Sequence, residues 1–228
     1  MRVESGFSLI ELLIVILILT ILVTLSVLTL SSNRRTVKTD DAAGAIYTLM
    51  RQARVQAITR RQFYAVVINV AGLDQTIPLN NSTKNLLFLA NSVSLVDMGT
   101  ISSVNDEEIS LSKLLPIDVT INAAAGLPSK TTAFLAPENA FSVHNFSSSV
   151  PNGTFVCYFD PAGRAVTRAD GTGTQEYRIF QFSANDIDLT KGPTLLRAVT
   201  LHGSTGGLKF WRFIPTLGPS GQWTTKLN

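Results

Sequence analysis

The sequence predicts an α+β protein in which one long helix precedes a domain of β-strands. Residues 7–30 form an apolar run with a single charged residue, and residues 37–61 carry apolar side chains at steps of three or four. After Gln62 apolar residues recur at every second position, as they do in half-buried strands. A chain of 228 residues with these patterns is expected to be one membrane-anchored protein with a single globular domain at residues 62–228.

The apolar run is long enough to cross a membrane. Its 24 residues extend about 36 Å as an α-helix, against roughly 30 Å for the hydrocarbon core of a bilayer. We expect the run to remain in the mature protein, because it is longer than the apolar region of a secretory signal and lacks an Ala-x-Ala cleavage site. Its one charge, Glu11, is costly in a bilayer and therefore calls for a partner. The alternative is an interfacial carboxylate without a role.

The start of the apolar run carries a short motif, which reads Gly6-Phe7-Ser8-Leu9-Ile10-Glu11. It resembles the processing site of type IV pilins and type II secretion pseudopilins. The resemblance implies that a prepilin peptidase removes residues 1–6 as a leader by cutting between Gly6 and Phe7, and that Phe7 is then N-methylated. It also implies that Glu11 meets the N-terminal amine of a neighbouring subunit, since a buried charge is tolerated when an opposite charge pairs with it.

The same resemblance gives the orientation in the membrane. It places the apolar run in a bacterial inner membrane as a single pass, with a cytoplasmic leader and the globular domain outside the cytoplasm. Arg34, Arg35 and Lys38 follow the run, and counting positive charges alone would favour the opposite orientation. We give the motif more weight, because the implied cleavage requires a cytoplasmic leader.

Residues 31–61 are predicted to continue the helix as an amphipathic second half. Its apolar stripe should let a sheet lie close, because most of its members are small. These members are Ala42, Ile46, Leu49, Ala53 and Ala57. The alternative is a break at residues 31–39, with Asp40 and Asp41 capping a second helix.

Eight strands are predicted from alternating apolar residues that are separated by turn residues. They cover residues 63–70, 86–89, 92–97, 117–121, 155–159, 177–183, 195–202 and 208–213. Residues 122–152 are rich in Ala, Ser, Asn, Pro and Gly and are expected to form long loops. The sequence Asp160-Pro161-Ala162-Gly163 is predicted to be a turn, because Asp accepts backbone hydrogen bonds, Pro fixes φ and Gly permits a positive φ.

Two segments of the chain carry a closer resemblance. Residues 45–70 read AIYTLMRQARVQAITRRQFYAVVINV, and residues 155–166 read FVCYFDPAGRAV. Both are similar to segments of the GspH/FimT family of minor pseudopilins. The resemblance implies a pilin-like fold, with the long helix packed on antiparallel β-sheets. It implies a structural subunit at the tip or in the priming complex of a type IV pilus or a type II secretion pseudopilus, with other pilin or pseudopilin subunits as partners.

Few residues in the chain are of the types that catalyse reactions or bind metals. Cys157 is the only cysteine and lies in an apolar strand, so we expect a buried, inert thiol and no disulfide within the chain. His144 and His202 are isolated, and no metal-binding spacing occurs. The acidic runs at residues 106–108 and 186–188 lack the spacing of a calcium loop and are expected to be solvated. The sequence therefore predicts no enzyme, no cofactor and no metal site.

A ligand-binding tip protein, for DNA uptake or adhesion, is the alternative function. Some FimT-like minor pilins take up DNA, and the candidate contacts here are Arg164, Arg168, Lys209 and Arg212. The Gly-Arg-x-Arg motif of the DNA-binding members is absent, because residues 207–209 read Gly-Leu-Lys. Strand alternation places Lys209 and Arg212 on opposite faces. We therefore favour a solvated strand face and a structural subunit over DNA binding.

Overall fold

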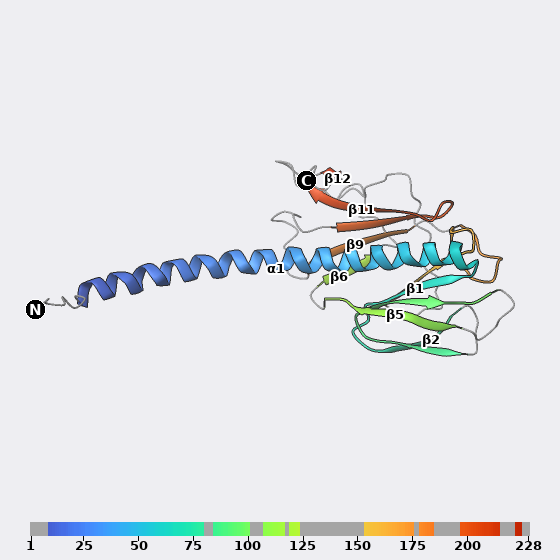
Figure 1. The fold of residues 1–228 in the computed structure, drawn as a ribbon, viewed down its shortest axis with the longest axis horizontal. Coiled ribbons are helices and arrows are strands. Elements are labelled where there is room, and N and C mark those ends of the chain that lie inside the picture. Colours follow the sequence, from blue (N-terminus) through green and yellow to red (C-terminus); the bar gives the residue numbers. More distant parts are fainter. Residues whose placement is uncertain are drawn as a thin grey trace, which may run out of the picture. The chain divides into compact units, whose positions relative to one another are not determined.

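The structure is a computed structural model, and it describes most of the chain. The described residues are 9–79, 84–100, 107–116, 119–123, 153–175, 178–184, 197–214 and 222–224. One helix and twelve strands lie within these ranges (Figure 1). The chain divides into two compact units, residues 1–37 and residues 38–228, and each is described by itself.

Helix α1 (Leu9–Arg60) runs through 52 residues without a break. The prediction of one continuous helix is therefore confirmed, and the alternative of a break at residues 31–39 is wrong. Continuity is expected physically, because no glycine or proline occurs in residues 9–43. The helix ends where Arg61 adopts a left-handed φ of 55°, a common way of terminating a helix.

In the first unit α1 is strongly apolar. Leu9–Ser26 has a mean hydropathy of 2.9 over 18 residues and is long enough to cross a membrane. The hydroxyls of Thr20, Thr24 and Ser26 each donate a hydrogen bond of 2.8 Å to the carbonyl oxygen four residues earlier. These hydroxyls thus find acceptors within their own helix.

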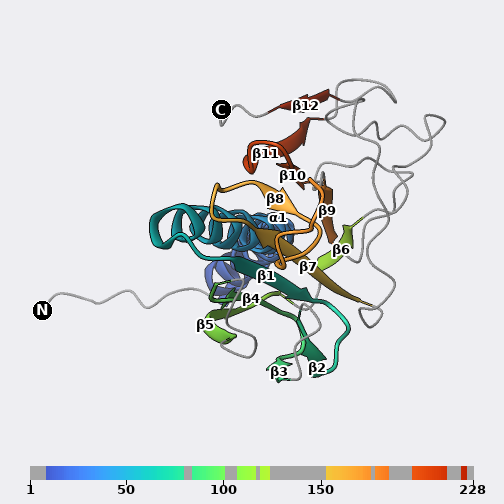
Figure 2. The same ribbon diagram turned by 90° about the vertical axis from the view of Figure 1, so that its right-hand side faces the viewer.

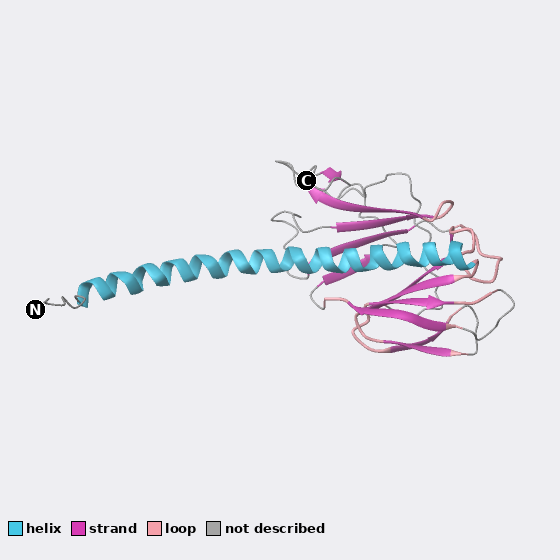
Figure 3. Cartoon of the chain, in the orientation of Figure 1, coloured by secondary structure: helices cyan, strands magenta, loops and turns pink. Residues whose placement is uncertain are grey.

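In the second unit two five-stranded antiparallel sheets pack against α1 (Figures 2 and 3). The first sheet has the order β5 (Glu108–Leu114), β4 (Ser92–Asp97), β1 (Tyr64–Asn69), β7 (Thr154–Phe159), β8 (Ala165–Val166). The second has the order β12 (Gln222–Thr224), β11 (Gly207–Ile214), β10 (Arg197–His202), β9 (Arg178–Ala184), β6 (Val119–Ala123). A separate hairpin pairs β2 (Gln75–Pro78) with β3 (Asn85–Phe88). Helix and antiparallel sheets together confirm the predicted α+β fold.

Two hydrophobic cores hold the second unit together. The first lies between α1 and the two sheets, with Leu95 from the first sheet and Phe180 from the second. All five predicted stripe residues of α1 belong to it and are at most 3% exposed. The second core lies between the first sheet and the β2–β3 hairpin, with Val67 and Phe88 among its members. Strand β1 is buried on both faces as a result, which explains why the residues from Ala65 to Ile68 are all apolar and do not alternate with polar ones.

The predicted strands compare closely with the observed ones. All eight are present, with ends that shift by up to two residues. Strands β2, β5, β8 and β12 have no counterpart in the prediction. Strands β8 and β12 have only two and three residues, and β2 has a single large apolar residue, Ile77, so none of the three shows alternation. In β5 the apolar residues Ile109 and Leu111 do alternate, but the acidic residues beside them favoured a loop.

Two loop predictions are wrong where the structure describes them. Glu107 was expected in a solvated loop but is 5% exposed, and its carbonyl oxygen accepts a hydrogen bond from Lys84. Glu108 pairs with Asp97 and begins β5, because the acidic run completes an antiparallel ladder with β4. Strand β6 continues to Ala123, into the segment expected to form long loops. Asp106 and residues 124–152 and 186–188 lie outside the described residues.

Two turns from different sheets meet beside α1. In the first, Asp160 Oδ1 accepts hydrogen bonds from the backbone N–H groups of Ala162 and Arg164 at 3.0 and 2.8 Å, which confirms the predicted turn. The second turn includes Gly206, whose φ is 60°. A Cβ atom on Gly206 would overlap the carbonyl oxygen of Gly163. Both the φ angle and this close approach therefore require glycine at position 206.

Replacing Gly206 by alanine is expected to destabilise the domain. The free energy of unfolding should fall by roughly 2–4 kcal/mol, because strain at positive φ and overlap with Gly163 act together. Gly44→Ala is the matched control, since Gly44 lies in α1 with nothing within 4 Å of an added Cβ. It should raise the free energy of unfolding by about 0.5–1 kcal/mol through helix propensity. Denaturant unfolding of the full chain in detergent measures both, and similar values for the two variants would contradict the close approach of the turns.

Candidate functional site

Of the residues predicted for processing and assembly, the structure places Glu11, which lies at the N-terminal end of α1. Gly6 and Phe7 lie outside the described residues, whereas Glu11 lies in the first turn of the helix with an exposed side chain. The large apolar side chains from Leu9 to Leu25 are 48–82% exposed. A helix that is apolar all round is stable among lipids or other helices rather than in water. This segment therefore offers an apolar surface that carries a single carboxylate.

Where α1 enters the second unit, an acidic side chain joins it to the second sheet. Arg197 of β10 donates from Nε to Asp40 Oδ1 at 2.5 Å and from Nη2 to Asp40 Oδ2 at 3.3 Å. Arg212 of β11 brings Nη2 to 3.6 Å from the same Oδ2. Arg197 is 5% exposed, so this ion pair is largely withdrawn from water. We call these three residues the Asp40 cluster.

Sequence reasoning missed the Asp40 cluster. It treated Asp40 as a possible helix cap and Arg212 as a possible DNA contact. The cluster forms because the pairing of β10 with β11 sets Arg197 directly opposite Arg212. No pattern along the chain indicates that these positions share a register, and 157 residues separate Asp40 from Arg197.

Three of the four candidate DNA contacts are ion-paired within the domain. Arg164 Nη2 lies 2.7 Å from Asp160 Oδ2, and Arg168 Nη1 lies 3.8 Å from Asp170 Oδ2. Hydrogen bonds from Thr172 lower the pKa of Asp170, which favours the ionised carboxylate beside Arg168. The third is Arg212, whose carboxylate partner belongs to the Asp40 cluster.

The fourth candidate, Lys209, lies on another face of β11. Its Nζ lies 5.6 Å from the ring centroid of Trp211, a cation–π distance. The indole Nε1–H of Trp211 donates to Thr200 Oγ1 at 3.0 Å, which fixes the ring against β10. Arg212 instead contacts α1, so alternation along β11 separates the two cations as expected. The four cations therefore do not converge on one surface.

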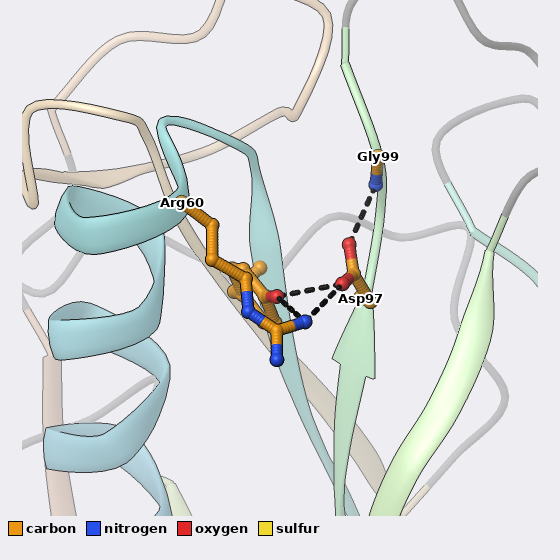
Figure 4. A network of polar contacts seen from close by, with 4 residues as sticks. Arg60, Asp97 and Gly99 are labelled. Carbon is orange, nitrogen blue, oxygen red and sulfur yellow. Dashed lines mark hydrogen bonds and ion pairs between the residues drawn. The ribbon is translucent and has the colours of Figure 1, made fainter.

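A second polar network lies where α1 ends (Figure 4). The Tyr64 hydroxyl donates to Asp97 Oδ2 at 2.6 Å, and Arg60 Nη1 donates to the Tyr64 hydroxyl at 3.2 Å. The N–H of Gly99 donates to Asp97 Oδ1 at 3.0 Å. Burial, with a smaller contribution from Asp97, raises the pKa of Tyr64 to about 12. The phenol therefore stays protonated at neutral pH and acts as a donor that ties the helix end to β1 and β4.

The described residues hold no group of three or more His, Cys, Asp and Glu side chains that could bind a metal ion. Cys157 is buried inside β7, as expected for an inert thiol.

Comparison with known proteins gives one match of sequence and several of structure. Residues 1–27 match the model of the prokaryotic N-terminal methylation motif. The type IV minor pilin FimU of Pseudomonas aeruginosa is 13% identical, with 78% of this chain and 89% of that chain covered and a TM-score of 0.40. The minor pseudopilin EpsH from the Type 2 Secretion System of Vibrio cholerae is 11% identical, with 76% and 94% covered and a TM-score of 0.42. No curated protein matches.

Proposed function

We propose that this pilin-like chain is a minor pilin or pseudopilin, a structural subunit at the tip or in the priming complex of a type IV pilus or a type II secretion pseudopilus. One observation carries the proposal: the methylation motif matched at residues 1–27 includes the first turns of a helix, whose large apolar side chains from Leu9 to Leu25 are exposed. An exposed apolar helix requires either lipid or neighbouring helices. A filament subunit has both in turn: lipid surrounds its helix in the membrane, and helices of other subunits surround it in the filament.

The proposal assigns a role to each part of the chain. Residues 1–6 are the leader, residues 7–30 the membrane helix, residues 31–61 the amphipathic half of the helix, and residues 62–228 the globular domain. The prepilin peptidase and other pilin subunits are the protein partners, and the inner membrane is the site of insertion. The globular domain lies on the extracytoplasmic side.

Glu11 is the residue that makes assembly selective in this proposal. A carboxylate in an apolar helix is costly, and an opposite charge within about 4–6 Å offsets that cost. Cleavage before Phe7 creates a new amine at the end of the same apolar segment. The amine of one subunit and Glu11 of the next then form an ion pair. Neither lipid nor a purely apolar helix offers Glu11 such a partner.

Replacing Gly6 by leucine is expected to leave the leader attached, because a bulky side chain next to the scissile bond blocks cleavage. Membrane insertion should persist, since residues 7–30 are unchanged. Mass analysis of the N-terminal peptide measures the outcome in chains purified from membranes. Ser8→Ala is the control and should still be cleaved. A mature Phe7 terminus in Gly6→Leu would contradict the assigned cleavage site.

A DNA-binding or adhesive tip remains the second candidate, and the site geometry does not favour it. Arg164, Arg168 and Arg212 each lie beside a carboxylate, so less of their charge is available to phosphates. The proposal for this chain is therefore structural, without a catalytic step or a cofactor.

A further inference from the structure

Strand β5 forms an exposed edge of the first sheet. Among the described strands it pairs with β4 alone and stands at the end of the strand order. Its side chains from Ser110 to Leu114 are all exposed, and these include two large apolar ones, Leu111 at 45% and Leu114 at 66%. An edge strand with exposed apolar residues is a template for pairing with another strand.

The pairing register shows which backbone groups of β5 point outward. Leu115, directly after β5, donates its N–H to the carbonyl oxygen of Asn91, directly before β4, at 2.7 Å, so these two residues occupy a hydrogen-bonded position of the ladder. In an antiparallel ladder such positions alternate with non-hydrogen-bonded ones. Ser112 therefore directs its N–H and C=O away from β4, and Leu114 does the same. The contact of 3.0 Å between the hydroxyls of Ser94 and Ser112 agrees, because side chains approach most closely in the non-hydrogen-bonded pairs.

Two cavities lie beside β5 along α1, and we call them together the α1–β5 trough. One cavity of ≈390 Å³ lies between Asp41 and Thr48 of the helix and Leu111 and Lys113 of the strand. A second, of ≈450 Å³, lies between Arg60 near the helix end and the first residues of β5. Together the two cavities border most of the strand, whose seven residues extend roughly 23 Å. The trough thus has the length of an extended peptide.

The walls of the trough carry opposite charges. Asp41 lies on the helix side and Lys113 on the strand side of the same cavity. Within the described part of the chain, neither side chain makes an ion pair. Asp40, the neighbour of Asp41, is engaged by Arg197 instead. An entering segment with charges of both signs would therefore find a partner for each.

We propose that β5 accepts an extended segment of another filament subunit, which adds a strand to the first sheet and places side chains in the α1–β5 trough. This inference rests on the proposed function, because that function supplies neighbouring subunits. Main-chain hydrogen bonds to Ser112 and Leu114 hold the segment, and Leu111 contacts its apolar side chains. A basic side chain of the segment meets Asp41, and an acidic one meets Lys113.

A photoreactive amino acid at position 111 of the full-length chain, expressed in its own cells, tests the proposal. Irradiation should give one adduct, and peptide mass spectrometry should place it on an extended segment of another pilin-like subunit. The same amino acid at Leu87 is the control, because Leu87 is 53% exposed but lies on β3. It should not give that adduct.

Two substitutions at Ser112 test the backbone contact. Ser112→Pro removes the outward N–H and should lower the adduct yield at least about tenfold, the equivalent of one hydrogen bond of ~1.4 kcal/mol. Ser112→Ala loses the same hydroxyl contact but keeps the N–H, so it should retain the adduct. Both should melt cooperatively, because proline is tolerated where the N–H of an edge strand points outward.

Four results would overturn the inference: no adduct at position 111, an adduct equal to that of the Leu87 control, equal yields from Ser112→Pro and Ser112→Ala, or unfolding of Ser112→Pro. An adduct of twice the chain's own mass would assign the trough to a second copy and would also contradict it. If adducts are absent while the N-terminus is processed and Glu11→Val abolishes assembly, only this inference fails. An unprocessed leader would instead remove the proposed function.

Discussion

Glu11→Val is expected to produce a chain that is processed and inserted into the membrane but is absent from filaments and tip complexes. The substitution makes the helix more apolar, so partition into the membrane should not suffer. In the proposed assembly it removes one partner of a buried pair, a change that costs about 3–5 kcal/mol. Association with neighbouring subunits should therefore weaken more than about a hundredfold. Co-purification of partner subunits with the variant measures the effect.

Leu13→Val is the matched control, because it changes an exposed apolar residue of the same segment without touching the charge. Partner subunits should co-purify with Leu13→Val as they do with the unchanged chain. Normal co-purification of Glu11→Val would make a pairing role for Glu11 untenable and would leave apolar contact as the sole basis of assembly.

Asp40→Ala is expected to destabilise the globular domain by about 3 kcal/mol, because it removes the Asp40 carboxylate from the buried guanidinium of Arg197. The estimate is at the lower end for a buried pair, since the Asp40 side chain is 28% exposed. Denaturant unfolding of the full chain in detergent gives the free energy difference. The contact joins α1 to the second sheet, so unfolding of that sheet should begin at lower denaturant.

Asp41→Ala is the control for Asp40→Ala. Asp41 is the same residue type at the next position of α1, is exposed, and makes no ion pair within the described residues. Its replacement should change the free energy of unfolding by less than about 0.5 kcal/mol. In the double variant Asp40→Leu with Arg197→Met, apolar side chains replace both charges, and most of the lost stability should return. Equal effects of Asp40→Ala and Asp41→Ala would show that the cluster adds nothing to stability.

Local patterns account for most of the fold. The helix was predictable because residues 9–43 contain no helix-breaking residue and because Ala42 to Ala57 keep one apolar stripe. Most strands were predictable because they contain several apolar residues bounded by turn residues. Strand β8 was missed because it has only two residues, and β2 because Ile77 is its one large apolar residue.

The contacts between elements could not be predicted in the same way. Asp40 and Arg197 meet only through the packing of α1 against β10, and this depends on the whole sheet. The exposed edge at β5 depends on strand order, which alternation along one strand does not encode. The motif around Glu11 is a short continuous stretch of sequence, so the role of Glu11 could be proposed from a few neighbouring residues.

The mass of the N-terminal peptide tests the proposed function most directly. The measurement uses the unaltered full-length chain, purified from the membranes of its own cells. A pilin-like subunit should begin at Phe7, with a methyl group on its amine and residues 1–6 absent. A chain that still begins at Met1, or one that has been cut after the apolar run, would contradict the account.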